Sequence, residues 1–225
     1  MIKACLFDLD GTLLNTLKSI RHYVNKNISQ YNIKELDEDE TRMFVGEGAK
    51  KLIKNILESR GFDLNDLETL KLLDNIHRSY VDEYDSEPAY LTEPYDGICD
   101  AVKQLKLFGI KLAVISNKPD ATVKQLSEKF FGESFSIVEG ARDKMPLKPE
   151  ASWPLDICKR LGVNPSEVMY VGDTSTDMKT AKNFGAGLAV GVLWGFRDRD
   201  ELIENGSDVL ISSPSELVNL ALNKR

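Results

Sequence analysis

The chain has 225 residues, a formal net charge of −7 and a sequence pI near 5.0. This balance argues against nucleic acid as the main partner, because no basic excess is present to neutralise phosphates, although a local pocket can still accept a small phosphorylated compound. Hydrophobic residues make up 42% of the chain, enough for a packed core, and no apolar run approaches the ~20 residues of a membrane span.

The beginning of the chain and its cysteines indicate the compartment. Met1-Ile2-Lys3 leads directly into an apolar segment, so we expect no signal peptide. The three cysteines, Cys5, Cys99 and Cys158, lack metal-binding spacing and are expected to be free thiols. We therefore expect a cytoplasmic protein with no membrane partner. The sequence leaves open whether it is a monomer or a homodimer.

The first predicted strand covers residues 3–7 and ends in two carboxylates, Asp8 and Asp10, which are followed by Gly11. In open α/β sheets, ligands bind just outside the carboxyl ends of the strands. Two acids at such a strand end can have separate roles: one can bind a cation or attack an electrophile, and the other can transfer a proton.

No convincing strand follows between residues 15 and about 90. Apolar residues recur at helical spacing instead, which predicts helices over 17–28, 37–45, 47–59 and 64–84, the last one broken near Leu72. Residues 91–97 have turn chemistry and mark the return of the chain. We expect residues 15–91 to form a helical insertion in a core made of 1–14 and 92–225.

From residue 98 onward, predicted helices and strands alternate. The helices cover 98–108, 121–131, 153–161, 178–184 and 215–222, and the strands cover 111–116, 135–139, 168–171, 187–193 and 208–211. This alternation predicts an α/β fold in which helices cover both faces of a parallel sheet. The first strand must join that sheet to be buried.

Polar residues gather in the loops after four of these strands. They are Asp8 and Asp10, then Ser116, Asn117 and Lys118, then Lys148, and finally Asp173 and Asp177. Clustered carboxylates repel one another unless a cation neutralises them, and oxygen ligands suit Mg²⁺. A lysine and a serine beside the metal suit phosphate oxygens. The pattern predicts metal-assisted phosphoryl transfer, with Asp8 as nucleophile and Asp10 as general acid and base.

Each of these segments also has a simpler interpretation when it is taken alone. Asp8 to Gly11 can be a turn, Ser116 to Pro119 a polar loop, Lys148 a solvated side chain, and Asp173 part of a helix start. Their order and their placement after strands favour the catalytic interpretation.

Together the motifs resemble those of the haloacid dehalogenase superfamily of phosphohydrolases. Residues 8–13 match its first motif, Asp-x-Asp-Gly-Thr/Val, and the other three motifs match at Ser116, at Lys148 and at Gly172-Asp173 with Asp177. The resemblance implies a Rossmann-like core and an aspartyl-phosphate on Asp8. It also implies Mg²⁺ held by Asp8, the Asp10 backbone carbonyl and Asp173, with support from Asp177.

The same resemblance implies the substrate contacts. Ser116, Asn117 and Lys148 would hold the phosphoryl group, and we also assign Gly11 and Thr12 to the substrate site. The insertion is similar to the C1-type cap of this family, and Gly46, Glu47 and Gly48 resemble its specificity loop. A plain interhelical turn is the alternative for that loop, and contact of Lys50 or Lys51 with substrate stays open.

Particular residues favour one branch of the superfamily. Asp10 argues against halide-releasing members, since a halide needs no acid to leave. Thr12, Ser116-Asn117-Lys118 and residues 191–195 are similar to phosphoglycolate phosphatases and related pyrophosphatases, although Lys148-Pro149-Glu150-Ala151 departs from their usual Lys-Pro-x-Pro.

We therefore predict a magnesium-dependent phosphatase for a small phosphorylated metabolite such as phosphoglycolate. The enzymatic alternatives are a pyrophosphatase, a nucleotidase or a phosphomutase of the β-phosphoglucomutase type. A catalytically idle binding protein of the same fold is the alternative outside enzymes. A response-regulator receiver is disfavoured by the helical insertion and by the second acid, Asp10.

Overall fold

The computed structural model describes residues 1–223, and the chain divides into two compact units. The core unit consists of Met1–Asn15 together with the chain from Glu93 onward, and the helical unit is Thr16–Thr92. Each boundary lies one residue further along the chain than the division expected from the sequence.

Within residues 1–223, the main sheet of the core unit has six parallel strands in the order β5-β4-β1-β6-β7-β8. The strands are β1 (Ala4–Phe7), β4 (Lys111–Pro119), β5 (Ile137–Ala141), β6 (Val168–Gly172), β7 (Leu188–Val192) and β8 (Val209–Ile211). All of β1 is buried, and Ala4 pairs with Lys111 on one side and with Val168 on the other. The carboxyl ends of β1, β4 and β6 therefore lie next to one another.

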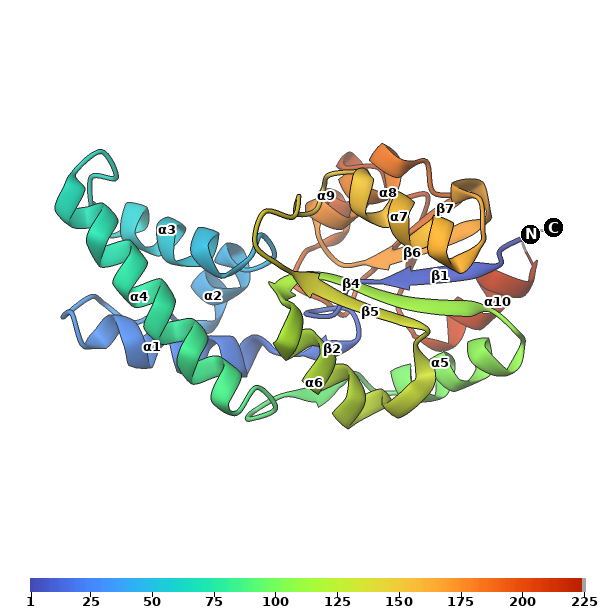
Figure 1. The fold of residues 1–225 in the computed structure, drawn as a ribbon, viewed down its shortest axis with the longest axis horizontal. Coiled ribbons are helices and arrows are strands. Elements are labelled where there is room, and N and C mark those ends of the chain that lie inside the picture. Colours follow the sequence, from blue (N-terminus) through green and yellow to red (C-terminus); the bar gives the residue numbers. More distant parts are fainter. Residues whose placement is uncertain (224–225) are drawn as a thin grey trace. The chain divides into compact units, whose positions relative to one another are not determined.

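Helices cover both faces of this sheet, as Figure 1 shows. The helices are α5 (Ile98–Leu107), α6 (Asp120–Phe131), α7 (Ser152–Leu161), α8 (Ser175–Phe184), α9 (Arg199–Glu204) and α10 (Ser215–Asn223), with short 3₁₀ turns η1 (Gly132–Ser134) and η2 (Pro165–Glu167). Alternate strand residues such as Ala4 and Leu6 pack with Trp153 and Met178 in one buried cluster, as the two-residue period of a strand requires. The predicted α/β class is confirmed.

The helical unit contains α1 (Leu17–Ser29), α2 (Glu38–Phe44), α3 (Ala49–Ser59) and α4 (Leu67–Ser86). The expected break near Leu72 was wrong, because α4 runs without interruption. Its buried side chains Leu73, Ile76, Tyr80 and Tyr84 keep helical spacing and form one apolar stripe.

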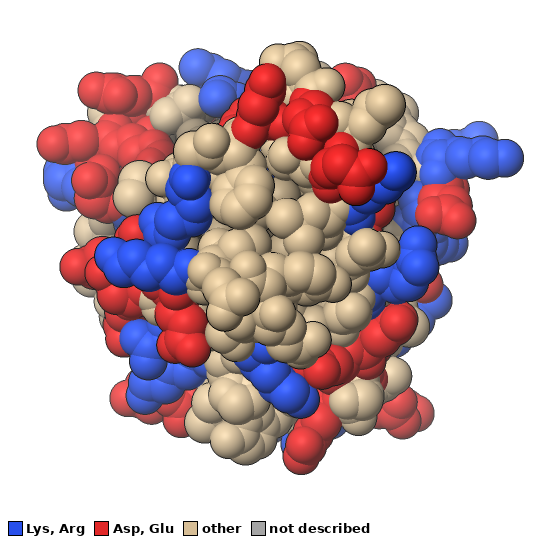
Figure 2. Space-filling view, turned by 90° about the vertical axis from the view of Figure 1, so that its left-hand side faces the viewer, with Lys and Arg blue, Asp and Glu red and all other residues tan. Residues whose placement is uncertain are grey.

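The surface of the helical unit mixes charged and apolar side chains. Figure 2 shows its end with a central uncharged area that is flanked by lysines, arginines and acids. Leu67 is 72% exposed and Met43 62% exposed in this unit. None of the helices within residues 1–223 is both long and apolar enough to cross a membrane.

Three further local features differ from the sequence expectation. A short antiparallel pair, β2 (Leu14–Asn15) and β3 (Glu93–Pro94), forms where only turns were expected. β4 continues through Pro119 instead of ending at Ser116. Residues 199–204, where the sequence predicted no helix, form α9, because the Asp198 side chain accepts the Glu201 N–H and caps the helix.

Candidate active site

Asp8 leaves the end of β1 at the centre of the sheet. Its backbone N–H donates to the Val171 carbonyl at 3.0 Å, which continues the β1–β6 ladder, and its side chain is buried. Gly11 follows with a φ of 84°, and a Cβ there would lie 2.2 Å from Asp173 Oδ2. Glycine is therefore required here both by the left-handed backbone and by the close approach of Asp173.

Lys148 joins two carboxylates inside the site. Its Nζ lies 2.8 Å from Asp8 Oδ1 and 2.8 Å from Asp177 Oδ1. Burial alone would lower the pKa of Lys148, but the charges of Asp177 and Asp8 outweigh it and raise that pKa well above its usual range. The lysine thus stays a cation between the two acids.

Asp173 is fully buried after β6 and is bound by two donors. The Thr12 hydroxyl donates to its Oδ1 at 2.8 Å, and the Phe196 N–H donates to its Oδ2 at 2.8 Å. Asp173 is thereby tied to the first motif and to the loop after β7.

Asp177 is fixed by the first turn of α8. Its Oδ2 accepts the Thr174 hydroxyl at 2.6 Å, and the Thr174 side chain caps the helix in return. This cap starts α8 at Ser175, earlier than the predicted residue 178. The Tyr170 hydroxyl donates to the other carboxylate oxygen of Asp177, Oδ1, at 3.2 Å.

Asp8, Asp173 and Asp177 form an acidic group within the described part of the chain, with one oxygen of each inside 4.8 Å of the others. Burial, reinforced by the charge of Asp177 and opposed by Lys148, raises the pKa of Asp8 to about 7. Burial and the charges of Asp177 and Asp8 raise the pKa of Asp173 well above its usual range. Buried carboxylates that repel one another and offer only hard oxygen donors fit a Mg²⁺ ion.

The Asp10 side chain lies outside this acidic group. Its two carboxylate oxygens pair with Lys118 Nζ at 3.2 and 3.3 Å. A metal contact by Asp10 was assigned to its backbone carbonyl, and that contact stays a prediction. Ser116 is buried at the end of β4, where its hydroxyl oxygen accepts the Lys118 N–H at 3.3 Å.

The structure brings the core-unit residues of the predicted site together, and it adds two that were not assigned to it. Lys118 was noted in its loop but given no role. Both Ser116 and Lys118 lie in β4, which continues to Pro119, so a longer predicted strand would have placed Lys118 at the same sheet edge as Ser116.

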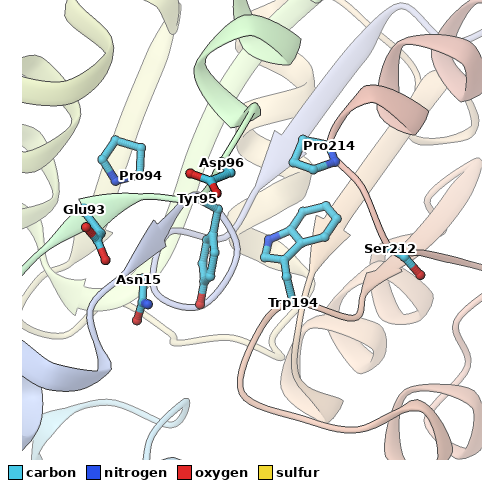
Figure 3. A pocket seen from close by; sticks show the side chains of 8 residues that line it. All are labelled: Asn15, Glu93, Pro94, Tyr95, Asp96, Trp194, Ser212 and Pro214. Carbon is cyan, nitrogen blue, oxygen red and sulfur yellow. The ribbon is translucent and has the colours of Figure 1, made fainter.

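Trp194 is the second addition. Its indole N–H donates to the Thr12 carbonyl at 3.0 Å, so the loop after β7 supports the first motif. Figure 3 shows Trp194 beside Tyr95 in a pocket of about 380 Å³. In the sequence, Trp194 was considered only as part of residues 191–195, which are similar to phosphoglycolate phosphatases and related pyrophosphatases. No local pattern predicts its long-range hydrogen bond to Thr12.

Gly46, Glu47 and Gly48 lie in the helical unit between α2 and α3. Gly46 and Gly48 have φ values of 112° and 92°, so both positions favour glycine. Lys50 Nζ pairs with Asp74 Oδ1 at 2.8 Å on the surface of this unit. Contact of this loop with a substrate stays a prediction.

Comparison with known proteins places the chain in a family. The sequence model of one protein family, the haloacid dehalogenase-like hydrolases, matches residues 5–190 of the chain. The chain is 30% identical to a phosphoglycolate phosphatase of Chromobacterium violaceum over 99% of this chain and 97% of that one. It is 26% identical to an N-acetylmuramic acid 6-phosphate phosphatase of Pseudomonas aeruginosa over 97% of this chain and 94% of the relative.

Solved structures agree with this assignment. A Lactobacillus delbrueckii subsp. bulgaricus protein, provisionally assigned as a phosphoglycolate phosphatase, superposes with a TM-score of 0.90 at 27% identity over 99% of both chains. CbbY from Rhodobacter sphaeroides in complex with phosphate gives 0.79 at 25% identity over 96% of both chains. With three motifs at the ends of β1, β4 and β6 and with Lys148 reaching Asp8 and Asp177, the chain belongs to the haloacid dehalogenase-like hydrolases.

Proposed function

We propose that this protein is a magnesium-dependent phosphatase that hydrolyses a small phosphomonoester, with phosphoglycolate as the first candidate. The observation that carries the proposal is the buried contact of Asp8 with Lys148 at 2.8 Å, beside Asp173 and Asp177. A carboxylate on the central strand and an adjacent cation provide a nucleophile and a partner for phosphoryl oxygens. The relatives named as phosphoglycolate phosphatases support this substrate.

In the first step, an Asp8 carboxylate oxygen attacks phosphorus while the ester oxygen–phosphorus bond breaks. The bonding electrons stay on the leaving oxygen, which takes a proton from Asp10. In the second step, Asp10 accepts a proton from water as the water oxygen attacks the phosphorus of the aspartyl-phosphate. The bond to Asp8 breaks, and inorganic phosphate is released with Asp8 restored.

The residues of the site would support these steps in distinct ways. Lys148 would hold the phosphoryl oxygens near Asp8, and Ser116 would donate to another of them. Magnesium, held by Asp8 and Asp173 with support from Asp177, would neutralise the carboxylates and the phosphoryl charge. Thr12 and the Phe196 N–H would keep Asp173 in place through the hydrogen bonds that they donate to it.

The test is phosphate release from a panel of small phosphorylated compounds, with Mg²⁺ and then with EDTA. The panel includes phosphoglycolate, N-acetylmuramic acid 6-phosphate, pyrophosphate, nucleoside monophosphates, hexose phosphates and β-glucose 1-phosphate. We expect magnesium-dependent turnover that is highest with phosphoglycolate.

Other outcomes of this panel would change the assignment. Isomerisation of β-glucose 1-phosphate without phosphate release would indicate a phosphomutase. A complete lack of turnover on every compound would contradict the enzymatic proposal.

A further inference from the structure

We propose that Lys118 selects substrates that carry a carboxylate next to the phosphate ester. In this proposal, Lys118 exchanges its ion pair with Asp10 for an ion pair with the substrate carboxylate. The inference deepens the proposed function and rests on it. It names a specificity residue that the sequence motifs leave without a role.

The contact between Lys118 and Asp10 is built into the fold. Lys118 lies in the last part of β4, and its side chain is only 7% exposed. Its Nζ is almost equally distant from the two oxygens of Asp10, at 3.2 and 3.3 Å. The ammonium group therefore faces the acid that is proposed to protonate the leaving oxygen.

The two lysines of the site serve different parts of a substrate. Lys148 contacts Asp8 and Asp177, so its charge lies where the phosphoryl group is transferred. Lys118 contacts Asp10, so its charge lies beside the leaving group. In phosphoglycolate a single methylene separates the leaving oxygen from the carboxylate, so a substrate whose leaving oxygen reaches Asp10 brings its carboxylate to Lys118.

Charge makes this exchange selective. The site holds Asp8, Asp10, Asp173 and Asp177, so a further carboxylate would be repelled without a cation beside it. A substrate carboxylate can take the place of Asp10 at the ammonium and leave Asp10 available for the leaving oxygen. A neutral substituent offers no such partner, and sites built to bind a polar group reject analogues that lack it.

The kinetic test compares phosphoglycolate with ethyl phosphate, in which a methyl group replaces the carboxylate. For Lys118→Met we expect KM for phosphoglycolate to rise by about 10- to 100-fold, because a charge-assisted contact is lost. KM for ethyl phosphate should change by less than about threefold. The control is Lys124→Met, which removes an exposed lysine paired with Asp120 on α6 and should leave both substrates unaffected.

Equal losses on the two substrates would overturn the proposal, and so would no loss on either. If Lys118→Met loses all activity, Lys118→Arg decides, because arginine keeps the positive charge. Retained preference for phosphoglycolate in Lys118→Arg supports the proposal, and a lost preference contradicts it.

A binding experiment separates this inference from the proposed function. Calorimetry on the Asp8→Asn protein measures the affinity for phosphoglycolate and for inorganic phosphate without turnover. Adding Lys118→Met should weaken phosphoglycolate binding by about 10- to 100-fold and leave phosphate binding within about threefold. Absence of phosphate release from the wild-type protein would contradict the phosphatase, whereas equal weakening of both ligands would contradict only the role of Lys118.

Discussion

Asn117 holds the backbone of Lys148 at two points. Its Oδ1 accepts the Lys148 N–H at 2.9 Å, and its Nδ2 donates to the Lys148 carbonyl at 3.2 Å. Both contacts are buried, and they join the end of β4 to the loop before α7, 31 positions further along the sequence. The position of the Lys148 ammonium between Asp8 and Asp177 thus depends on an amide side chain on another strand.

Asn117→Ala should lower kcat by about 10- to 100-fold and the free energy of unfolding by about 2–4 kcal/mol, because two buried backbone groups lose their partners. Kinetics and denaturant unfolding measure these effects. The matched control is Asn183→Ala, whose Nδ2 donates to the Pro149 carbonyl at an exposed site where water can replace it. Equal behaviour of the two variants would show that Asn117 does not position Lys148.

Asp8→Asn should lower phosphate release by at least about a thousandfold, because an amide cannot form the aspartyl-phosphate. Its fold should be retained, since asparagine has nearly the same shape. Turnover and circular dichroism check the two parts. The control is Asp156→Asn, a change at an exposed acid of α7, which should leave turnover unchanged. Near-wild-type turnover of Asp8→Asn would rule out the covalent route.

Without divalent metal, the free energy of unfolding should fall as the pH rises from about 5 to about 7. Burial raises the pKa of Asp8 from 3.8 to about 7, so the folded chain binds more protons than the unfolded chain in this window. The stabilising contribution of the protonated group is present at low pH and is lost as the pH passes the folded pKa. One such group contributes a slope of at most about 1.4 kcal/mol per pH unit.

Thermal unfolding in EDTA at several pH values measures this slope, and Asp8→Asn should reduce it to the part that the raised pKa of Asp173 contributes. Added Mg²⁺ should raise the melting temperature more at pH 7.5 than at pH 5, because metal and protons compete for the same oxygens. A slope that is the same in wild type and Asp8→Asn would contradict the assignment to Asp8.

Trp194→Phe should weaken Mg²⁺ binding by about three- to tenfold, because the Thr12 carbonyl loses the indole N–H and Thr12 supports Asp173. A calorimetric titration with Mg²⁺ measures this change in affinity. Trp153→Phe is the control, since it removes a buried bond to Glu139 in the core. The Trp153→Phe change should lower the stability of the fold and leave the Mg²⁺ affinity unaltered. An unchanged Mg²⁺ affinity in Trp194→Phe would contradict the role of Trp194 in supporting Thr12.

The sequence predicted those parts of the site whose position follows from strand ends. Asp8, Ser116 and Asp173 come directly at or after buried strands, and a parallel sheet must bring such ends to one edge. Lys148 lies well beyond its strand, and its motif rather than any local pattern placed it in the site.

The remaining features depend on contacts that no local pattern contains. The ion pair of Lys118 with Asp10 joins β4 to the loop after β1, and the bond from Trp194 to Thr12 joins two loops that lie 182 positions apart in the sequence. α8 begins early because Thr174 and Asp177 form a reciprocal cap. α4 stays continuous because burial of one apolar stripe outweighs weak local signals near Leu72.

The central place of β1 also has a consequence for how the chain is made. β1 is synthesised before the other strands of its sheet, yet both strands that flank it, β4 and β6, are made only after the whole helical unit. Until then, its apolar residues and both of its backbone edges lack their final neighbours, and such long-range pairing is slow. A nascent chain stopped before Val168 would lack β6 and the strand end that carries Asp173, so the growing protein acquires its complete acidic group late in translation.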